Sequence, residues 1–285
     1  MTAVGLACLS AFLFGSMTVV LRIGLRRTPD AELAAVATLV VALAVVLVVA
    51  AAEAPSRGVH AGDAWPFVLA GLLSPGAAQL FVTLGVRDAG ASRTSMVFGT
   101  APLVAVTIAL VFLGEPLSGP LLVGAILIVA GGIELARERT RPEHLRRIGL
   151  LFAFVGTVLF ATRDNIVRWL SGDTSVPPAA AGTAALVGGT LLVLVAICPR
   201  LRGRPLEGAR AFVPAGLCFG LSYVALFEAY FRGKVTIVSP LVATESLWAV
   251  GLSALLLRDS EVVGRRLVAG AVLIVAGGVL IGAAR

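Results

Sequence analysis

Gly124-Ala-Ile-Leu-Ile-Val-Ala-Gly-Gly132 and Gly270-Ala-Val-Leu-Ile-Val-Ala-Gly-Gly278 are identical at eight of nine positions and lie 146 residues apart. The same offset relates Phe14–Arg22 to Phe160–Arg168, whose first and last residues match, and it relates Glu115 to Glu261. Matching blocks at one offset, spread over half the chain, indicate a duplication. We therefore expect two similar units, residues 1–140 and 141–285.

The composition around these blocks is that of a membrane protein. Of 285 residues, 58% are hydrophobic and 14% charged, against about 25% charged in soluble domains. Charge-free stretches such as Leu33–Ala52 and Leu267–Ala284 have the ~18–20 apolar residues that cross a bilayer as a helix. We expect an all-α membrane protein with helices at 3–22, 32–52, 64–85, 91–113, 116–136, 148–169, 178–198, 209–231, 236–257 and 263–284.

Five helices per unit is an odd number, so the second unit enters the membrane upside down relative to the first. The sequence thus predicts ten transmembrane helices as two inverted five-helix repeats. This organisation is typical of transporters that work by alternating access, with the substrate site near the midplane between the repeats.

The motifs also resemble those of a known family. Ala101-Pro102 followed by Gly124–Gly132, repeated in degenerate form as Leu247-Trp248 followed by Gly270–Gly278, is similar to EamA-type transporters of the drug/metabolite transporter (DMT) superfamily. The resemblance covers essentially the whole chain. It implies five plus five helices, a multi-pass protein of the inner membrane, and export of amino acids, metabolites or drugs.

Glu245 is the deepest charged residue of the predicted helices. It lies nine residues into helix 236–257, or ~14 Å from that end. A charge at the midplane costs roughly 2.5–3.5 kcal/mol, which makes Glu245 a candidate to bind a coupling proton or a cationic group of the substrate. Trp248, three positions later, shares its face of the helix. The alternative is a structural carboxylate paired with an arginine or a hydroxyl.

Other candidates for substrate or proton binding come from two more helices of the second unit. Helix 148–169 carries Arg163 and Asp164, and Asp164 can also pair with Arg168 four positions on. Helix 209–231 carries Ser222 and Tyr223; the alternative for its aromatic residues is simple packing.

In the first unit, only Gln79 and the nearby Ser74 are similarly placed, next to a Pro75-Gly76 break that predicts a kinked helix. The glycines of helices 116–136 and 263–284 recur seven apart, which favours close helix packing. A homodimer through these two helices is a further expectation. Glu115 and Glu261 are expected to lie in turns.

Several classes of function are excluded by the sequence. There is no Gly-x4-Gly-Lys-Ser/Thr loop for a nucleotide, no nucleophile motif and no cluster of metal ligands, so we expect no enzyme, no cofactor and no metal site. The net charge of +7 comes from residues mainly between the apolar stretches, which argues against a nucleic-acid partner.

Of the functions considered, secondary active transport remains. We expect export of a small metabolite or drug-like solute by alternating access, with proton coupling through Glu245. The alternatives are a non-transporting membrane scaffold or accessory protein, and an exchanger of phosphorylated solutes that depends on Arg163. Most basic residues follow odd-numbered helices, which predicts both termini outside the cell, whereas the family is usually drawn with both inside.

Overall fold

The computed structural model describes residues 2–57, 61–104, 107, 119–136, 146–172, 174–201, 206–233, 238, 241–257 and 264–283. Within these ranges every regular element is helical. The α-helices are α1 (Ala3–Arg27), α2 (Ala31–Arg57), α3 (Trp65–Gly71), α4 (Ala78–Ala89), α5 (Ala91–Phe98), α7 (Gly119–Ala136), α8 (Arg147–Ser171), α9 (Pro178–Leu201), α10 (Val213–Arg232), α12 (Glu245–Leu256) and α13 (Arg265–Ala283). Shorter turns are η1 (Ala61–Asp63), η2 (Leu72–Ala77) and η3 (Glu207–Phe212).

Six of the described helices are long and apolar enough to cross a membrane. They are Ala3–Arg27, Ala31–Pro55, Trp65–Ala89, Arg147–Ser171, Pro178–Leu201 and Glu207–Arg232. The predicted all-α membrane protein is therefore confirmed at this level. Parts of the other four predicted helices, together with Glu115 and Glu261, lie outside the described residues.

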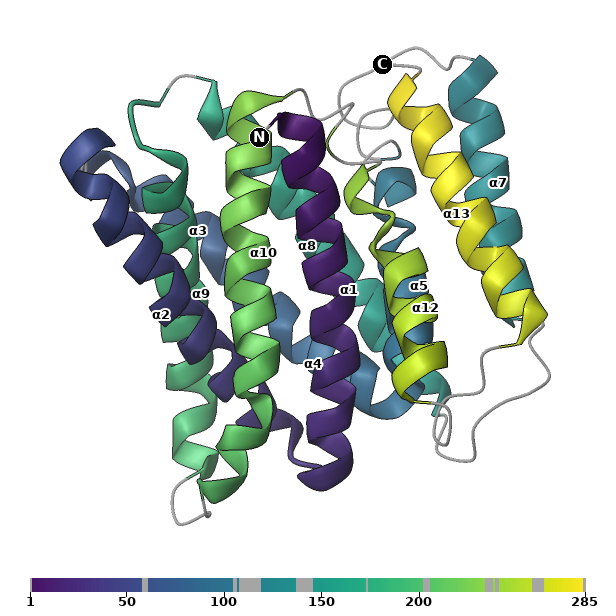
Figure 1. The fold of residues 1–285 in the computed structure, drawn as a ribbon, viewed down its shortest axis with the longest axis horizontal. Helices are drawn as coiled ribbons and strands as arrows, with labels where there is room; N and C mark the ends of the chain where they lie inside the picture. The colour runs from purple at the N-terminus through teal and green to yellow at the C-terminus, as the bar shows by residue number, and fades with distance from the viewer. Residues whose placement is uncertain are drawn as a thin grey trace.

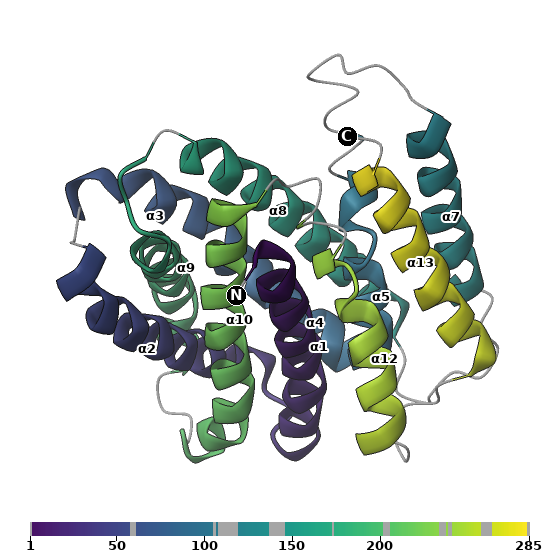
Figure 2. The same ribbon diagram turned by 45° about the horizontal axis from the view of Figure 1, so that its top comes forward.

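The helices form one bundle (Figures 1 and 2). α1 packs along α10 at its centre, α2, α3 and α9 pack on one side, and the α7–α13 pair forms the opposite edge. The largest cluster of buried apolar side chains includes Phe14, Leu39, Phe67 and Phe219, which come from four different helices. The start of α1 and the end of α13 lie at the same end of the bundle (Figure 1).

The predicted kink near Pro75-Gly76 is confirmed. Between α3 and α4 the backbone of Ser74 is extended, with φ −148° and ψ 122°, inside the π-helical turn η2. Proline has no N–H to donate and its ring crowds the preceding turn, so a helix bends at this point. Next to the kink, α3 meets α9 backbone to backbone: a Cβ on Gly71 would lie 1.9 Å from the carbonyl oxygen of Ala185.

The glycine-rich helices pack against each other within the chain. A Cβ on Gly124 would lie 2.7 Å from the carbonyl oxygen of Gly277, and one on Gly131 would lie 2.6 Å from that of Gly270. The close packing that the glycines predicted is thus an antiparallel contact of α7 with α13. A homodimer would have to use other faces of these helices and stays a prediction.

Candidate functional site

A cavity of about 50 Å³ lies at the centre of the bundle, enclosed by α1, α5, α8, α10 and the start of α12. Its wall is formed by Ser10 and Phe14 of α1, Phe98 of α5, Thr157, Phe160, Arg163 and Asp164 of α8, Phe219, Ser222, Tyr223, Leu226 and Tyr230 of α10, Glu245 of α12, Ala101, which follows α5, and Val242 and Ala243, which precede α12. Both predicted units contribute to this wall. The volume suits a few water molecules or a small ion, since one water needs roughly 10–15 Å³.

Four phenylalanines form one side of the cavity, and each comes from a different helix. The ring of Phe14 lies edge-on to those of Phe98, Phe160 and Phe219, with centroids 5.9, 5.7 and 5.9 Å away. Such edge-to-face pairs stabilise packing by about 0.5–1.5 kcal/mol beyond burial of the rings. They hold α1, α5, α8 and α10 around the cavity.

Arg163 is completely buried at the cavity. Its guanidinium carbon lies 4.9 Å from the ring centroid of Tyr223, 5.4 Å from that of Phe160 and 5.8 Å from that of Phe227. Its Nη1 atom forms an ion pair with Oδ1 of Asp164 at 3.1 Å. None of its three side-chain nitrogens has a hydrogen-bond partner in the described part of the chain. The positive charge is therefore held by ring faces and one carboxylate.

Hydroxyl groups of α10 connect the cavity to neighbouring helices. The Ser222 hydroxyl donates to the carbonyl oxygen of Ser10 at 3.0 Å, and the Oγ atoms of both serines also lie 3.0 Å apart. The Tyr223 hydroxyl donates to the carbonyl oxygen of Ser74 at 3.3 Å. Because Ser74 lies at the kink, this bond connects α10 to the break between α3 and α4 and satisfies a buried carbonyl group.

Glu245 is buried and is the first residue of α12. The continuous helix predicted over 236–257 is wrong at this point, because residues 243–244 form a turn. The Thr244 hydroxyl donates to the carbonyl of Leu241 at 2.6 Å, and the Ser246 hydroxyl to that of Ala243 at 3.0 Å. Such local bonds compete with helical ones. The Glu245 carboxyl group lies at the start of α12 and lines the same cavity as Asp164, so two carboxyl groups share this buried space.

The structure brings five of the seven predicted site residues together: Arg163, Asp164, Ser222, Tyr223 and Glu245. Trp248 is 46% exposed and packs edge-on against Phe12 on the outside of α1, with centroids 5.2 Å apart. Gln79 is buried on α4 away from the cavity, and its amide atoms have no hydrogen-bond partner among the described residues.

The spacing also allowed Asp164 to pair with Arg168, and the structure gives each of these side chains another partner. Asp164 contacts Arg163, whereas Nη1 of Arg168 donates to the carbonyl oxygen of Tyr230 at 3.2 Å. Arg168 thereby satisfies a carbonyl group in the last turn of α10, where positive charge is favoured.

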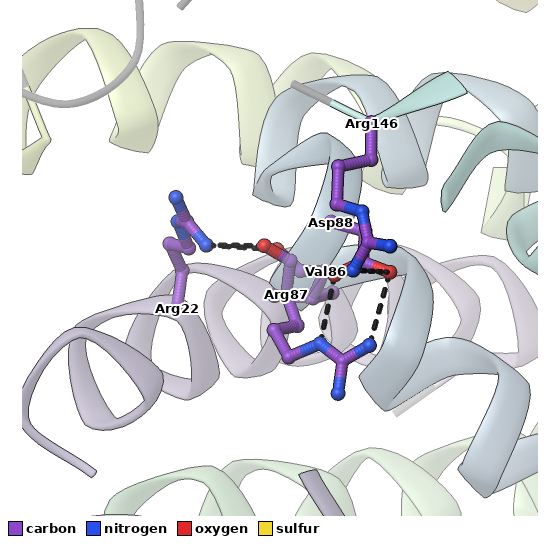
Figure 3. A network of polar contacts seen from close by, with 5 residues as sticks. All are labelled: Arg22, Val86, Arg87, Asp88 and Arg146. Carbon is purple, nitrogen blue, oxygen red and sulfur yellow. Dashed lines mark hydrogen bonds and ion pairs between the residues drawn. The ribbon is translucent and has the colours of Figure 1, made fainter. Parts of the chain in front are cut away.

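A second polar network, outside the central cavity, connects α1 to the end of α4 and the start of α8 (Figure 3). Arg22 of α1 donates through Nη1 to the carbonyl oxygen of Arg87 at 2.7 Å. The Asp88 carboxylate accepts from Nε and Nη2 of Arg87 at 2.7 and 3.0 Å, and Nη1 of Arg146 lies 3.9 Å from it. The Arg146 amide also donates to the Asp88 carbonyl at 2.8 Å. This network joins α1, the end of α4 and the start of α8.

Comparison with known proteins identifies the family. The model of the EamA-like transporter family matches residues 1–134 and residues 147–283. The chain belongs to the EamA-like transporter family. The resemblance seen in the sequence is thus confirmed, and membership indicates a membrane transporter of the drug/metabolite type. A search of the curated proteins finds no match. A solved crystal structure superposes on this EamA-like chain with a TM-score of 0.66 and 21% identity over 96% of both chains, which shows the fold alone.

Sequence reasoning missed several cavity residues of this EamA-like transporter. Ser10 and Thr157 are single hydroxyl groups in apolar helices and gave no pattern to follow, whereas Tyr230 was noted only as part of an aromatic face of helix 209–231. Phe14 and Phe160 were visible as the matching first residues of a repeated block, but that match was used only as evidence of duplication. In the structure the two rings contact each other across the cavity wall.

Proposed function

We propose that this chain is a proton-coupled secondary transporter that exports a small solute by alternating access at the Arg163–Asp164–Glu245 cavity. The observation that carries the proposal is the set of charges around this cavity: one guanidinium and two carboxyl groups.

Charge balance explains how such a site couples two ligands. The positive charge of Arg163 compensates one carboxylate, that of Asp164, with which it forms an ion pair. A second buried carboxylate is costly unless it gains a partner. Glu245 then requires either a proton or a cationic group of the solute. Because both occupy the same carboxyl group, binding of one displaces the other, which is the basis of proton-coupled exchange.

The packing supports two inverted five-helix repeats, residues 1–140 and 141–285, and ten membrane spans. Gly124 contacts Gly277 and Gly131 contacts Gly270, and a shift of 146 residues converts the first contact into the second. Phe14 contacts its own counterpart, Phe160. On a larger scale α1 packs along α10, and its counterpart α8 packs along α4. A two-fold relation between the repeats produces this pattern, and the two matched segments agree with it.

The size of the cavity supports alternating access rather than an open pore. At about 50 Å³ it is well below the ~300–1,000 Å³ of pockets that hold small-molecule ligands. Entry of a metabolite therefore requires helices to move apart on one side. The Asp88 network holds α1, α4 and α8 together at one end, so its release is the step we assign to opening there.

The proposal places the chain in the inner membrane as a multi-pass protein. The start of α1 and the end of α13 lie at the same end of the bundle, which fits an even number of crossings (Figure 1). Most arginines follow odd-numbered helices, and the positive-inside rule then places both termini outside. A C-terminal reporter that is active only in the cytoplasm would contradict this orientation.

Flux measurements in proteoliposomes test the transport mechanism. Solutes are first found by comparing metabolite loading of cells with and without the protein, and proton movement is then followed with an internal pH dye. We expect solute-dependent proton flux that Glu245→Gln abolishes and that Glu207→Gln, at an exposed carboxylate in η3, leaves intact.

Two other results would contradict the proposal, and each would favour a different function. If folded protein moved no tested solute, a scaffold or accessory role would be favoured. If Glu245→Gln retained flux while a folded Arg163→Ala variant lost it, the chain would be an exchanger of phosphorylated solutes.

A further inference from the structure

A second cavity, of about 600 Å³, lies where α2 begins and where α4 and α9 end. It shares no lining residue with the Arg163 cavity. Its wall combines apolar side chains of α4 and α9 with charged groups of both signs, two arginines and two carboxylates. A site at the helix ends of a membrane protein lies at the level of the lipid headgroups.

On two of these helices, the order of the side chains matches the order of groups in a phospholipid. Leu80, Leu84 and Arg87 follow one face of α4, and Ile197 precedes Arg200 by three residues on α9. Each arginine therefore lies ~4.5 Å nearer the helix end than the apolar residue before it. Arginines at this depth meet lipid phosphates, and the apolar residues below them meet the first carbons of the acyl chains.

The start of α2 supplies negative charge on another side of the cavity. Oδ1 of Asp30 accepts from the amides of Glu32 and Leu33 at 3.1 and 3.0 Å, which holds this carboxylate at the N-terminus of α2. The Glu32 side chain is 33% exposed, and its Oε1 atom lies 3.9 Å from Nη1 of Arg200. This is a long ion pair between partly exposed side chains, and a ligand that carries both charges can replace it by pairing with each side chain separately.

We propose that this cavity binds the headgroup of an ethanolamine phospholipid. The phosphate lies between Arg87 and Arg200, and the primary ammonium group donates hydrogen bonds to Glu32 and Asp30. An ammonium group has three N–H donors, whereas the trimethylated ammonium of a choline headgroup has none, so the carboxylates select ethanolamine. An anionic glycerol headgroup brings no cation and would face both carboxylates.

Lipid competition on the purified full-length chain tests this site. Detergent-solubilised protein is mixed with dioleoyl phosphatidylethanolamine, phosphatidylcholine or phosphatidylglycerol, and the bound lipid is measured by native mass spectrometry. We expect about tenfold tighter binding of the ethanolamine lipid than of the choline lipid, which is the factor for one net charge-assisted hydrogen bond. Equal binding of these two lipids, or preference for phosphatidylglycerol, would overturn the proposal.

Variants then test which side chains produce the preference for the ethanolamine lipid over the choline lipid. Glu32→Gln should remove the preference for ethanolamine over choline, and Arg200→Gln should weaken both lipids alike because it removes a phosphate contact. Glu207→Gln, outside the cavity, is the matched control and should keep the wild-type preference. A preference that survives Glu32→Gln would place the ethanolamine site elsewhere and overturn the assignment. Lipid binding and solute flux are separate readouts, so neither result depends on the other.

Discussion

Replacing Arg163 by methionine tests how the charges of the central cavity are balanced. The side chain is fully buried, forms a 3.1 Å ion pair with Asp164, and lies over three aromatic rings at 4.9–5.8 Å. Removal of one partner from a buried ion pair costs about 3–5 kcal/mol, because the other charge stays behind. The Asp164 side chain is 21% exposed toward the cavity, which lowers the expected loss for Arg163→Met to about 3 kcal/mol.

The double variant separates charge from packing. In Arg163→Met/Asp164→Asn no charge of the pair remains, so we expect it to recover at least half of the stability that Arg163→Met loses. Asp164→Asn alone leaves the guanidinium without its carboxylate and should also destabilise the fold. The coupling energy between the two sites should then exceed about 1.5 kcal/mol.

Unfolding in mixed micelles with rising dodecyl sulfate gives these free energies, with fluorescence of the three tryptophans as the signal. Arg265→Met, at an exposed arginine that begins α13, is the matched control and should stay within about 0.5 kcal/mol of wild type. Additive losses in the double variant would refute the reasoning, because they would show that the two side chains do not compensate each other.

Two further predictions concern the framework around the cavity, and both use the same unfolding assay. Gly71→Ala places a methyl group 1.9 Å from the backbone oxygen of Ala185 and should lower the free energy of unfolding by about 3 kcal/mol or more. In the control Gly251→Ala the methyl group meets no atom within 4 Å, so the variant should be neutral or slightly stabilised. Equal effects of the two variants would contradict the contact of α3 with α9. Asp88→Asn weakens the bidentate contact with Arg87 and should lower the free energy of unfolding by about 1–2 kcal/mol. Arg146→Gln should cost less, because the contact of Arg146 with Asp88 is 3.9 Å long. The reverse order would contradict the geometry in Figure 3.

The sequence predicted those features that depend on short stretches of chain. Apolar stretches of sufficient length predicted the membrane helices, because length and hydrophobicity decide which segments can cross lipid. Pro75 predicted the kink, because the missing N–H is a property of that residue alone. Repeated glycines predicted close packing of α7 and α13, because small side chains allow backbones to approach.

Features that depend on how the helices face one another could not be predicted in this way. Trp248 shares a helix with Glu245, yet α12 turns it against Phe12 outside the cavity. Asp164 has arginines one and four residues away; it pairs with Arg163, while Arg168 donates to a backbone carbonyl of α10. The break before Glu245 was missed for a different reason, since it depends on hydroxyl bonds of Thr244 and Ser246 within an apolar stretch.

Two-sided labelling of position 222 tests directly whether the central cavity opens alternately to each face of the membrane. Ser222 is 2% exposed and lines the cavity. Ser222→Cys is introduced after Cys8, Cys198 and Cys218 are replaced by alanine, and an impermeant maleimide is applied to right-side-out and to inside-out vesicles. We expect labelling from both sides, with reversal of the pH gradient shifting it from one side to the other unless Glu245 is glutamine. Labelling that stays confined to one side, or that ignores the gradient, would contradict alternating access at this cavity.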